Sequence, residues 1–168
     1  MVCVANFVEE VQVLSLQVPG VGVFSWQYLV LDLNGTLTVD GELVAGVPER
    51  LTQLGELLEI SLLTADTRGT AQALAKALGV ACVRLEHGAE AEQKARYVAS
   101  LGAERVIAIG NGQNDAQMLA RASLGIAVLG SEGASFKAMA NADIVVPGIV
   151  EALDLLLKPA RLLATWRQ

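Results

Sequence analysis

A chain of 168 residues, 53% of them hydrophobic, can build one domain with a substantial core but not two large ones. The net charge of -6 and the pI of about 4.8 disfavour nucleic acids and anionic membranes as partners, because both would be repelled. Mean hydropathy is high at +0.47, yet no apolar run approaches the roughly 20 residues that a membrane-spanning helix needs, so we expect no membrane association.

The first expected element is a β-hairpin within residues 10–26. Val11, Val13 and Val18 precede Pro19-Gly20, and further apolar residues follow, which is the pattern of two short strands joined by a tight turn. We expect this hairpin to cover one edge of a larger sheet. Residues 1–9 carry no clear pattern.

From residue 28 onward, short apolar segments alternate with helix-like segments at the spacing of βαβ units. The apolar segments are nearly continuous, as strands buried on both faces of a parallel sheet must be. This pattern indicates an α/β fold with a mainly parallel sheet. The expected strands are 28–33, 60–64, 80–84, 105–109, 124–128 and 143–146. The expected helices are 47–58, 67–78, 89–101, 113–121, 132–139 and 148–157. Residues 28–157 would form the core of a single domain spanning 1–168, with 158–168 as a C-terminal tail.

Asp32-Leu33-Asn34-Gly35-Thr36-Leu37 directly follows the most hydrophobic expected strand. Its polar groups would emerge at the carboxyl end of a parallel strand, which is the sheet edge where α/β folds bind ligands. Taken alone, the segment reads better as an ordinary turn that leaves a strand. Three further segments favour a site.

Two other expected strands also end in polar groups. Strand 60–64 ends at Thr64, where a hydroxyl and the adjacent Ala65 amide can hold a phosphate oxygen, whereas Asp66 and Thr67 fit better as helix caps. Strand 105–109 leads into the loop 110–115, whose glycines allow close backbone approach and whose last residue, Asp115, can reach a cation. Three strands would therefore bring polar groups to one edge.

Lys94 lies on the expected helix 89–101. Most lysines on helices are solvated, and this one can be read in that way. Because its helix precedes the strand 105–109, however, Lys94 can also point its ammonium at the same sheet edge. A phosphoryl-transfer site needs such a cation, since a carboxylate nucleophile and a phosphate repel each other.

At these residues the sequence resembles the haloacid dehalogenase (HAD) superfamily. The superfamily has four motifs in fixed order: an Asp-x-Asp-Gly-Thr loop, a strand-end Ser or Thr, a Lys, and a Gly-Asp-Gly-x-x-Asp loop. Here they fall at 32–36, Thr64, Lys94 and 110–115. The resemblance covers residues 28 to about 157 and implies a three-layer, Rossmann-like HAD fold.

Within the superfamily, the chain is similar to the phosphorylation domain of P-type ATPases. The likeness runs through Leu63-Thr64-Ala65-Asp66-Thr67 and continues through Leu124-Gly125-Ile126-Ala127-Val128 and Ala142-Asp143. Small proteins of this kind are soluble P-type-ATPase-like phosphatases. Too few residues separate Asp32 from Thr64 for a nucleotide-binding domain, so we expect no ion pumping.

The resemblance implies the roles of the site residues. Asp32 would be the nucleophile that forms a phospho-aspartate, Thr64 would hold the phosphoryl group and Lys94 would neutralise its charge. The implied cofactor is Mg²⁺, and the implied metal residues are Asp32, Asn34 through its carbonyl, Asn111 and Asp115. The residues that would contact a small phosphorylated substrate are Asn34, Gly35, Thr64, Ala65 and Lys94.

Two positions depart from the family pattern. Asn34 replaces the Asp that protonates the leaving group and then activates water, so alkyl phosphates should be hydrolysed slowly. Asn111 replaces an Asp near the metal, which should lower Mg²⁺ affinity. A slow phosphohydrolase or phosphotransferase is favoured, and a non-catalytic phospho-ligand sensor or regulatory protein stays open. The third hypothesis, a structural oligomer with an inactive relic of the site, is supported only by the apolar C-terminus.

The gaps between the motifs leave no room for a cap domain. The first gap has room only for a hairpin that turns at Asp40-Gly41 and for one helix. Capless enzymes exclude water by oligomerising or by binding a large substrate, so we expect a homo-oligomer. The apolar segments 153–157 and 162–166, on either side of Pro159, offer surface for it, and packing of this region on its own sheet is an equal alternative.

The remaining reactive residues have ordinary explanations. Two cysteines, Cys3 and Cys82, are too few for a disulfide framework and fit buried thiols. The single histidine, His87, fits a solvated loop. The N-terminus lacks the basic start and apolar segment of a signal peptide, so we expect a cytoplasmic protein.

Overall fold

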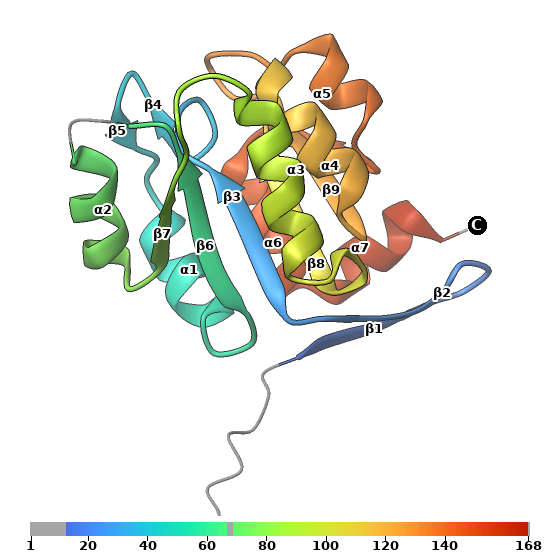
Figure 1. Cartoon of the computed structure of the whole chain (residues 1–168). Helices are drawn as coiled ribbons and strands as arrows, with labels where there is room; N and C mark the ends of the chain where they lie inside the picture. Colours follow the sequence, from blue (N-terminus) through green and yellow to red (C-terminus); the bar gives the residue numbers. More distant parts are fainter. Residues whose placement is uncertain (1–12, 67–68, 168) are drawn as a thin grey trace, which may run out of the picture.

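The computed structural model describes residues 13–66 and 69–167. Six parallel strands form a central sheet in the order β10-β9-β8-β3-β6-β7 (Figure 1). The strands are β3 (Tyr28–Asp32), β6 (Glu59–Thr64), β7 (Ala81–Arg84), β8 (Val106–Gly110), β9 (Leu124–Val128) and β10 (Ile144–Val146). The expected mainly parallel sheet is therefore confirmed.

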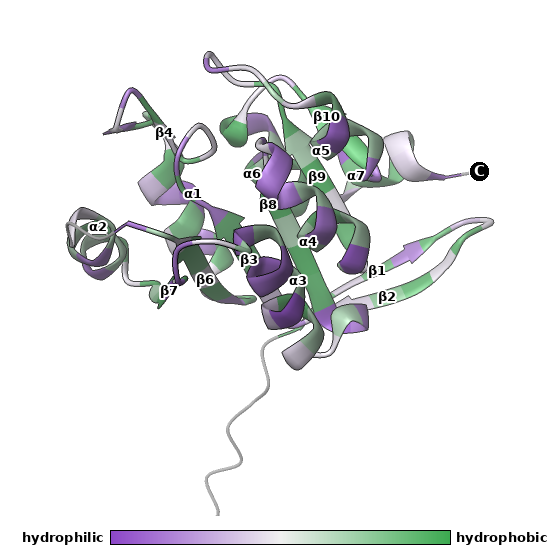
Figure 2. Cartoon of the chain, turned by 45° about the horizontal axis from the view of Figure 1, so that its top comes forward, coloured by the Kyte–Doolittle hydropathy of each residue, from purple (hydrophilic) through white to green (hydrophobic). Residues whose placement is uncertain are grey.

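Helices cover both faces of the sheet, which makes three layers. One face packs against α1 (Val47–Leu54), α2 (Thr70–Leu78), α6 (Ile149–Leu157) and α7 (Pro159–Trp166), and the other against α3 (Glu90–Ser100), α4 (Ala116–Arg121) and α5 (Phe136–Ala140). Along β3, Leu29 and Leu31 join the first core and Val30 joins the second. Apolar residues on both faces explain why this strand reads as a continuous apolar run. Figure 2 shows the apolar strands beneath the more polar outer surfaces of α3 and α4.

The N-terminal hairpin forms, but it does not lie where we expected. β1 (Leu14–Val18) pairs antiparallel with β2 (Gly22–Trp26), and Gly20 has a φ of 80°, as the Pro19-Gly20 turn requires. The two strands form a sheet of their own and pair with neither edge strand, β7 or β10. Only one residue separates β2 from the central strand β3, so the hairpin lies beneath the amino end of the sheet (Figure 1). Residues 10–12 of the prediction lie outside the described residues.

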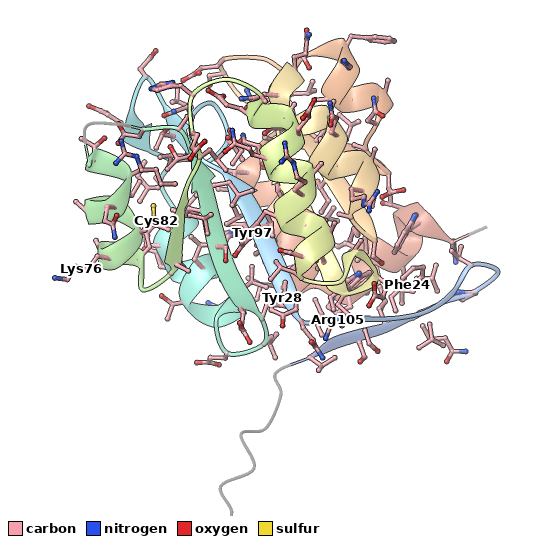
Figure 3. All side chains as sticks on the ribbon, in the orientation of Figure 1. Phe24, Tyr28, Lys76, Cys82, Tyr97 and Arg105 are labelled. Carbon is pink, nitrogen blue, oxygen red and sulfur yellow. The ribbon has the colours of Figure 1, made fainter. Side chains whose placement is uncertain are left out.

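The C-terminal segment is a helix rather than a tail. α7 begins at Pro159, which is suited to the first turn of a helix, and Leu162 is buried. The Trp166 ring lies 4.6 Å from the Phe24 ring of the hairpin, which is labelled in Figure 3, and 6.1 Å from the Trp26 ring. The described C-terminal leucines therefore pack within the chain, which is the alternative to a subunit interface.

The segment between β9 and α5 also differs from the prediction. A helix was expected over 132–139, but α5 begins only at Phe136, where the Ser135 hydroxyl accepts a hydrogen bond from the Ala138 amide. The residues before it form a loop in which Gly130 and Gly133 have positive φ values of 58° and 80°. We call residues 129–135 the β9–α5 loop.

Short connections complete the fold. β4 (Thr38–Val39) and β5 (Glu42–Leu43) form the expected hairpin with Asp40-Gly41 at its tip, and a 3₁₀ turn (Gln113–Asp115) leads into α4. No described segment between Asp32 and Lys94 forms a cap domain. In the described ranges, no helix combines the length and apolarity that crossing a bilayer requires. His87 is exposed and Cys82 is only half-buried, and Cys3 lies outside the described residues.

Candidate active site

Three adjacent strands end at one cavity. Asp32 is the last residue of β3, Thr64 the last of β6 and Gly110 the last of β8, and β3 lies between the other two. The cavity at this edge has a volume of about 530 Å³. Its lining consists of Asp32, Leu33, Asn34, Thr64, Ala65, Asp66, Thr70, Glu90, Lys94, Asn111, Gly112 and Asn114. The structure thus brings the predicted residues Asp32, Asn34, Thr64, Ala65, Lys94 and Asn111 to one place.

Lys94 reaches this cavity from α3 and is only 2% exposed. Its Nζ lies 2.5 Å from Asp32 Oδ1 and 2.6 Å from Asp115 Oδ1. A buried ammonium must be paired, and the two carboxylates provide both partners. Burial lowers the pKa of Lys94, but Asp32 and Asp115 outweigh it and hold that pKa above its ordinary value. Lys94 therefore stays charged.

Burial also shifts the pKa of Asp32, upward rather than downward, because Asp32 is an acid. Burial, followed by the neighbouring Asp115 carboxylate, raises the pKa of Asp32 to about 6, although the Lys94 charge opposes the shift. Asp32 Oδ2 accepts a hydrogen bond of 3.2 Å from the Thr36 hydroxyl. One oxygen thus faces a cation and the other a hydroxyl, which holds the carboxylate in one orientation.

Asp115 lies beneath the cavity floor and is fully buried. Its Oδ2 accepts hydrogen bonds from the Asn111 and Gly112 amides, at 3.0 and 2.8 Å. A Cβ on Gly110 would lie 2.6 Å from the Asp115 Cγ, so a glycine at the end of β8 leaves room for this carboxylate. Asp115 therefore shapes the loop as well as pairing with Lys94.

The loop after β3 turns sharply around Gly35, which has a φ of 76°. Asn34 is exposed on this loop and lines the cavity. Across the cavity, Thr64 Oγ1 accepts a hydrogen bond of 3.1 Å from the Asp66 amide, which leaves the hydroxyl hydrogen available for a ligand. Asp66 also accepts from the Ala71 amide at 2.9 Å, consistent with its predicted capping of α2.

The donor set fits Mg²⁺. One ammonium shared by two carboxylates leaves net negative charge at the cavity floor, which favours a further cation. Within the described ranges, no three His, Cys, Asp or Glu side chains gather to hold a metal by themselves. Mg²⁺ suits such a site because it takes one or two carboxylates and completes its shell with phosphate oxygens and water. Asp115 would contact it directly only by sharing Oδ1 between Lys94 and the ion.

Comparison with known proteins agrees with this geometry. A family model of haloacid dehalogenase-like hydrolases matches residues 9–123, which is more than half of the chain. The chain belongs to this family. Its fold resembles the deoxy-D-mannose-octulosonate 8-phosphate phosphatase of Haemophilus influenzae, with a TM-score of 0.65 and 17% identity over 79% of this chain and 88% of that one.

Sequence relatives of this HAD-like hydrolase include a small protein and a much larger transporter. An uncharacterised protein of Methanocaldococcus jannaschii is 47% identical over 88 residues, which cover 50% of this chain and 95% of that protein. A copper-exporting P-type ATPase of Staphylococcus aureus is 33% identical over 137 residues, which cover 79% of this chain but only 16% of the transporter. A zinc-transporting P-type ATPase shares the fold, with a TM-score of 0.60 and 26% identity over 73% of this chain and 20% of that one.

Sequence reasoning missed several residues of the HAD-like site. Thr70, Glu90 and Asn114 line the cavity, and Asn114 Nδ2 donates a hydrogen bond of 3.0 Å to Glu90 Oε2. Asn114 stands in the loop 110–115, so that motif already contained a signal for it. Glu90 opens a helix, where an acidic residue is common for other reasons, so its pattern carried no such signal.

Proposed function

We propose that this HAD-like hydrolase is a phosphohydrolase or phosphotransferase that acts through a phospho-aspartate on Asp32. The observation that carries the proposal is the placement of Asp32 in the cavity, paired with a buried lysine. A carboxylate held beside a cation is arranged to approach a phosphate, whose own negative charge would otherwise repel it.

The reaction has two steps. In the first, an Asp32 oxygen attacks phosphorus, the bond from phosphorus to the leaving oxygen breaks, and the leaving oxygen takes a proton from solvent. In the second, water attacks phosphorus and releases a proton to solvent, the bond to Asp32 breaks, and phosphate and a free carboxylate remain. Attack by another hydroxyl compound in place of water gives phosphotransfer.

Each polar side chain has a role in these steps. Lys94, already paired with Asp32, neutralises charge on the phosphoryl oxygens, and Thr64 donates its free hydroxyl hydrogen to one of them. Asn34 and Ala65 line the cavity around that group, and Gly35 forms the turn behind Asn34 without lining the cavity itself. Mg²⁺, when bound, would supply further charge neutralisation and would be held by the Asp32 and Asp115 carboxylates and the Asn34 carbonyl, with Asn111 nearby.

The substrate is a small phosphorylated compound. A cavity of about 530 Å³ lies within the range usual for small-molecule sites. A structurally similar phosphatase of Moraxella catarrhalis, with a TM-score of 0.62 and 16% identity, contains magnesium, phosphate and a KDO molecule. That relative supports a phosphorylated sugar or polyol as the substrate class. The proposal includes a cytoplasmic location and a homo-oligomer. The oligomer rests on the uncapped cavity alone, because the C-terminal leucines pack within the chain.

A second candidate, a phospho-ligand sensor, rests on Asn34. An amide beside the nucleophile has no proton to exchange, so the site can hold a phosphorylated ligand without turning it over efficiently. Under this alternative Asp32 binds ligand but forms no acyl phosphate.

Covalent labelling separates the two candidates. The protein is incubated with Mg²⁺ and acetyl phosphate, and the adduct is located by mass spectrometry after acid quench. We expect a base-labile phosphoryl group on Asp32, absent from Asp32→Asn and present in Asp154→Asn, a matched control remote from the cavity. A wild type that binds phosphate yet never acquires the label supports the sensor, and label on Asp32→Asn removes the nucleophile assignment.

A further inference from the structure

The β9–α5 loop packs against two loops of the site, the one that follows Asp32 and the one that follows β8. A Cβ on Gly130 would lie 3.3 Å from the Gly35 carbonyl oxygen of the first, and the Ser135 amide donates a hydrogen bond of 2.8 Å to the Asn111 carbonyl of the second. The side chains of Asn111 and Glu132 form hydrogen bonds across this contact. The proposed reaction steps do not require these hydrogen bonds.

Asn111 uses its side-chain amide in both directions. Its Oδ1 accepts a hydrogen bond of 3.1 Å from the Thr36 hydroxyl, and its Nδ2 donates one of 3.0 Å to the Gly133 carbonyl. An aspartate has no N–H and could not make the second bond. An Asp at this position would instead set a carboxylate against a carbonyl oxygen.

Glu132 connects the β9–α5 loop to the β4–β5 hairpin. Its Oε1 accepts a hydrogen bond of 2.8 Å from the amide of Asp40, at the tip of the β4–β5 hairpin. A Cβ on Gly35 would lie 3.1 Å from Glu132 Oε2 and 2.5 Å from Asn111 Nδ2, so both side chains approach this glycine too closely for a larger residue to fit. Asn111 and Glu132 therefore converge on the turn beside the nucleophile.

Thr36 links this arrangement to Asp32. Its hydroxyl has one hydrogen and two acceptors, Asp32 Oδ2 at 3.2 Å and Asn111 Oδ1 at 3.1 Å. The two acceptors share this single hydrogen, and Asn111 helps to hold the Thr36 side chain beside Asp32. Asn111 thus reaches the nucleophile through a single hydroxyl.

We propose that Asn111 and Glu132 are positioning residues: together they clamp the β4–β5 hairpin and the turn at Gly35 to the β9–α5 loop, and so hold Thr36 and Asp32 in place. Asn111 then serves as a hydrogen-bonding residue of the clamp and not as a weakened metal ligand. The effect of the clamp on turnover rests on the proposed function, whereas the clamp between the loops does not.

Hydrogen exchange on the metal-free protein tests the clamp without any activity. Glu132→Ala removes the acceptor of the Asp40 amide, and exchange of that amide should become about five-fold faster or more. Glu132→Gln retains an acceptor oxygen and should stay within about two-fold of the wild type. Glu42→Ala, on the same hairpin but outside the clamp, is the matched control and should leave the Asp40 amide unchanged. Equal exchange in Glu132→Ala and the wild type overturns the proposal.

Asn111→Asp separates a clamp from a weakened metal ligand. As a clamp residue, Asn111→Asp should lower kcat about ten-fold without lowering the Mg²⁺ concentration needed for half-maximal activity. If position 111 is instead a metal-ligand position, Asn111→Asp should lower the Mg²⁺ concentration needed for half-maximal activity, because a carboxylate binds Mg²⁺ more tightly than an amide does. Higher kcat and a lower Mg²⁺ requirement in Asn111→Asp overturn the clamp. If the wild type has no turnover, the exchange of the Asp40 amide decides alone.

Discussion

Asn34→Asp is the substitution that best measures how far this site is built for catalysis. Asn34 is exposed, lines the cavity and stands two residues after Asp32. Asparagine and aspartate have nearly the same shape, and an exposed exchange of this kind changes stability by less than about 0.5 kcal/mol. The variant therefore adds a carboxyl group beside the nucleophile without rebuilding the fold.

The expected gain follows from the surroundings of Asn34. A well-tuned general acid accelerates a reaction by about 10²–10⁴-fold. An exposed aspartate has a pKa near its reference value of about 3.9, so at neutral pH few molecules carry the proton that an alkoxide needs. We therefore expect a gain of about ten-fold for alkyl phosphates, rising as the pH falls toward 6.

Two substrates make the assay specific. kcat/KM is measured with saturating Mg²⁺ on glycerol phosphate, which leaves as an alkoxide, and on para-nitrophenyl phosphate, whose leaving group hardly needs a proton. For para-nitrophenyl phosphate, Asn34→Asp should raise kcat/KM by less than about three-fold. Asn114→Asp adds the same charge to the cavity without standing beside Asp32, so it should produce no selective gain.

One result would refute the reasoning. If Asn34→Asp leaves both substrates equally slow while Mg²⁺ and phosphate still bind, a missing acid does not limit this site. The protein is then better described as a sensor, and the covalent label on Asp32 should be absent as well.

The remaining predictions concern the metal, the fold and the assembly. Asp115→Asn should raise the Mg²⁺ concentration for half-maximal activity by about ten-fold or more, measured by metal titration, and an unchanged requirement would remove Asp115 from the metal site. Hydrogen bonds from Arg50 and Lys158 lower the pKa of Asp154 to about 2 from 3.8. Because Lys158 is half-exposed, solvent screening limits the corresponding stabilisation to about 1 kcal/mol. That stability is present above about pH 4 and lost as pH falls toward 2, so urea unfolding of Asp154→Asn should match the wild type near pH 2 and differ at pH 7. Trp166→Ala should cost about 2 kcal/mol in the same assay by removing the half-buried ring that packs on Phe24, and a loss below about 0.5 kcal/mol would contradict that packing. Sedimentation should show a dimer or tetramer, and a monomer of 17.6 kDa at micromolar concentration would end the oligomer prediction.

The sequence predicted the sheet well because its four central strands, β9, β8, β3 and β6, are buried on both faces and read as apolar runs. All six strands lie within about two residues of their predicted places, although the edge strand β7 is only partly buried. The hairpin was predicted by Pro19-Gly20, but its place was not. A strand pattern does not say which neighbour a hairpin meets, and here the short link to β3 keeps it beneath the sheet.

The order of the motifs placed most of the site. Asp32, Thr64 and the loop 110–115 each follow a strand, and parallel strands bring their carboxyl ends to the same edge. Lys94 required an assumption about the direction of its side chain, and the structure buries it between two carboxylates.

What the sequence determined by itself is local and periodic: the strands, most helices, both tight turns and the polar groups at strand ends. Only the tertiary structure decided which distant residues meet. Glu132 is 92 positions from Asp40 and Asn111 is 75 from Thr36, and neither spacing has a pattern that sequence reasoning could detect. The C-terminal leucines were equally suited to a partner subunit and to their own core, because apolar surface does not specify what buries it. Packing on the hairpin and sheet selected the second, and the same long-range packing set the β9–α5 loop beside the nucleophile.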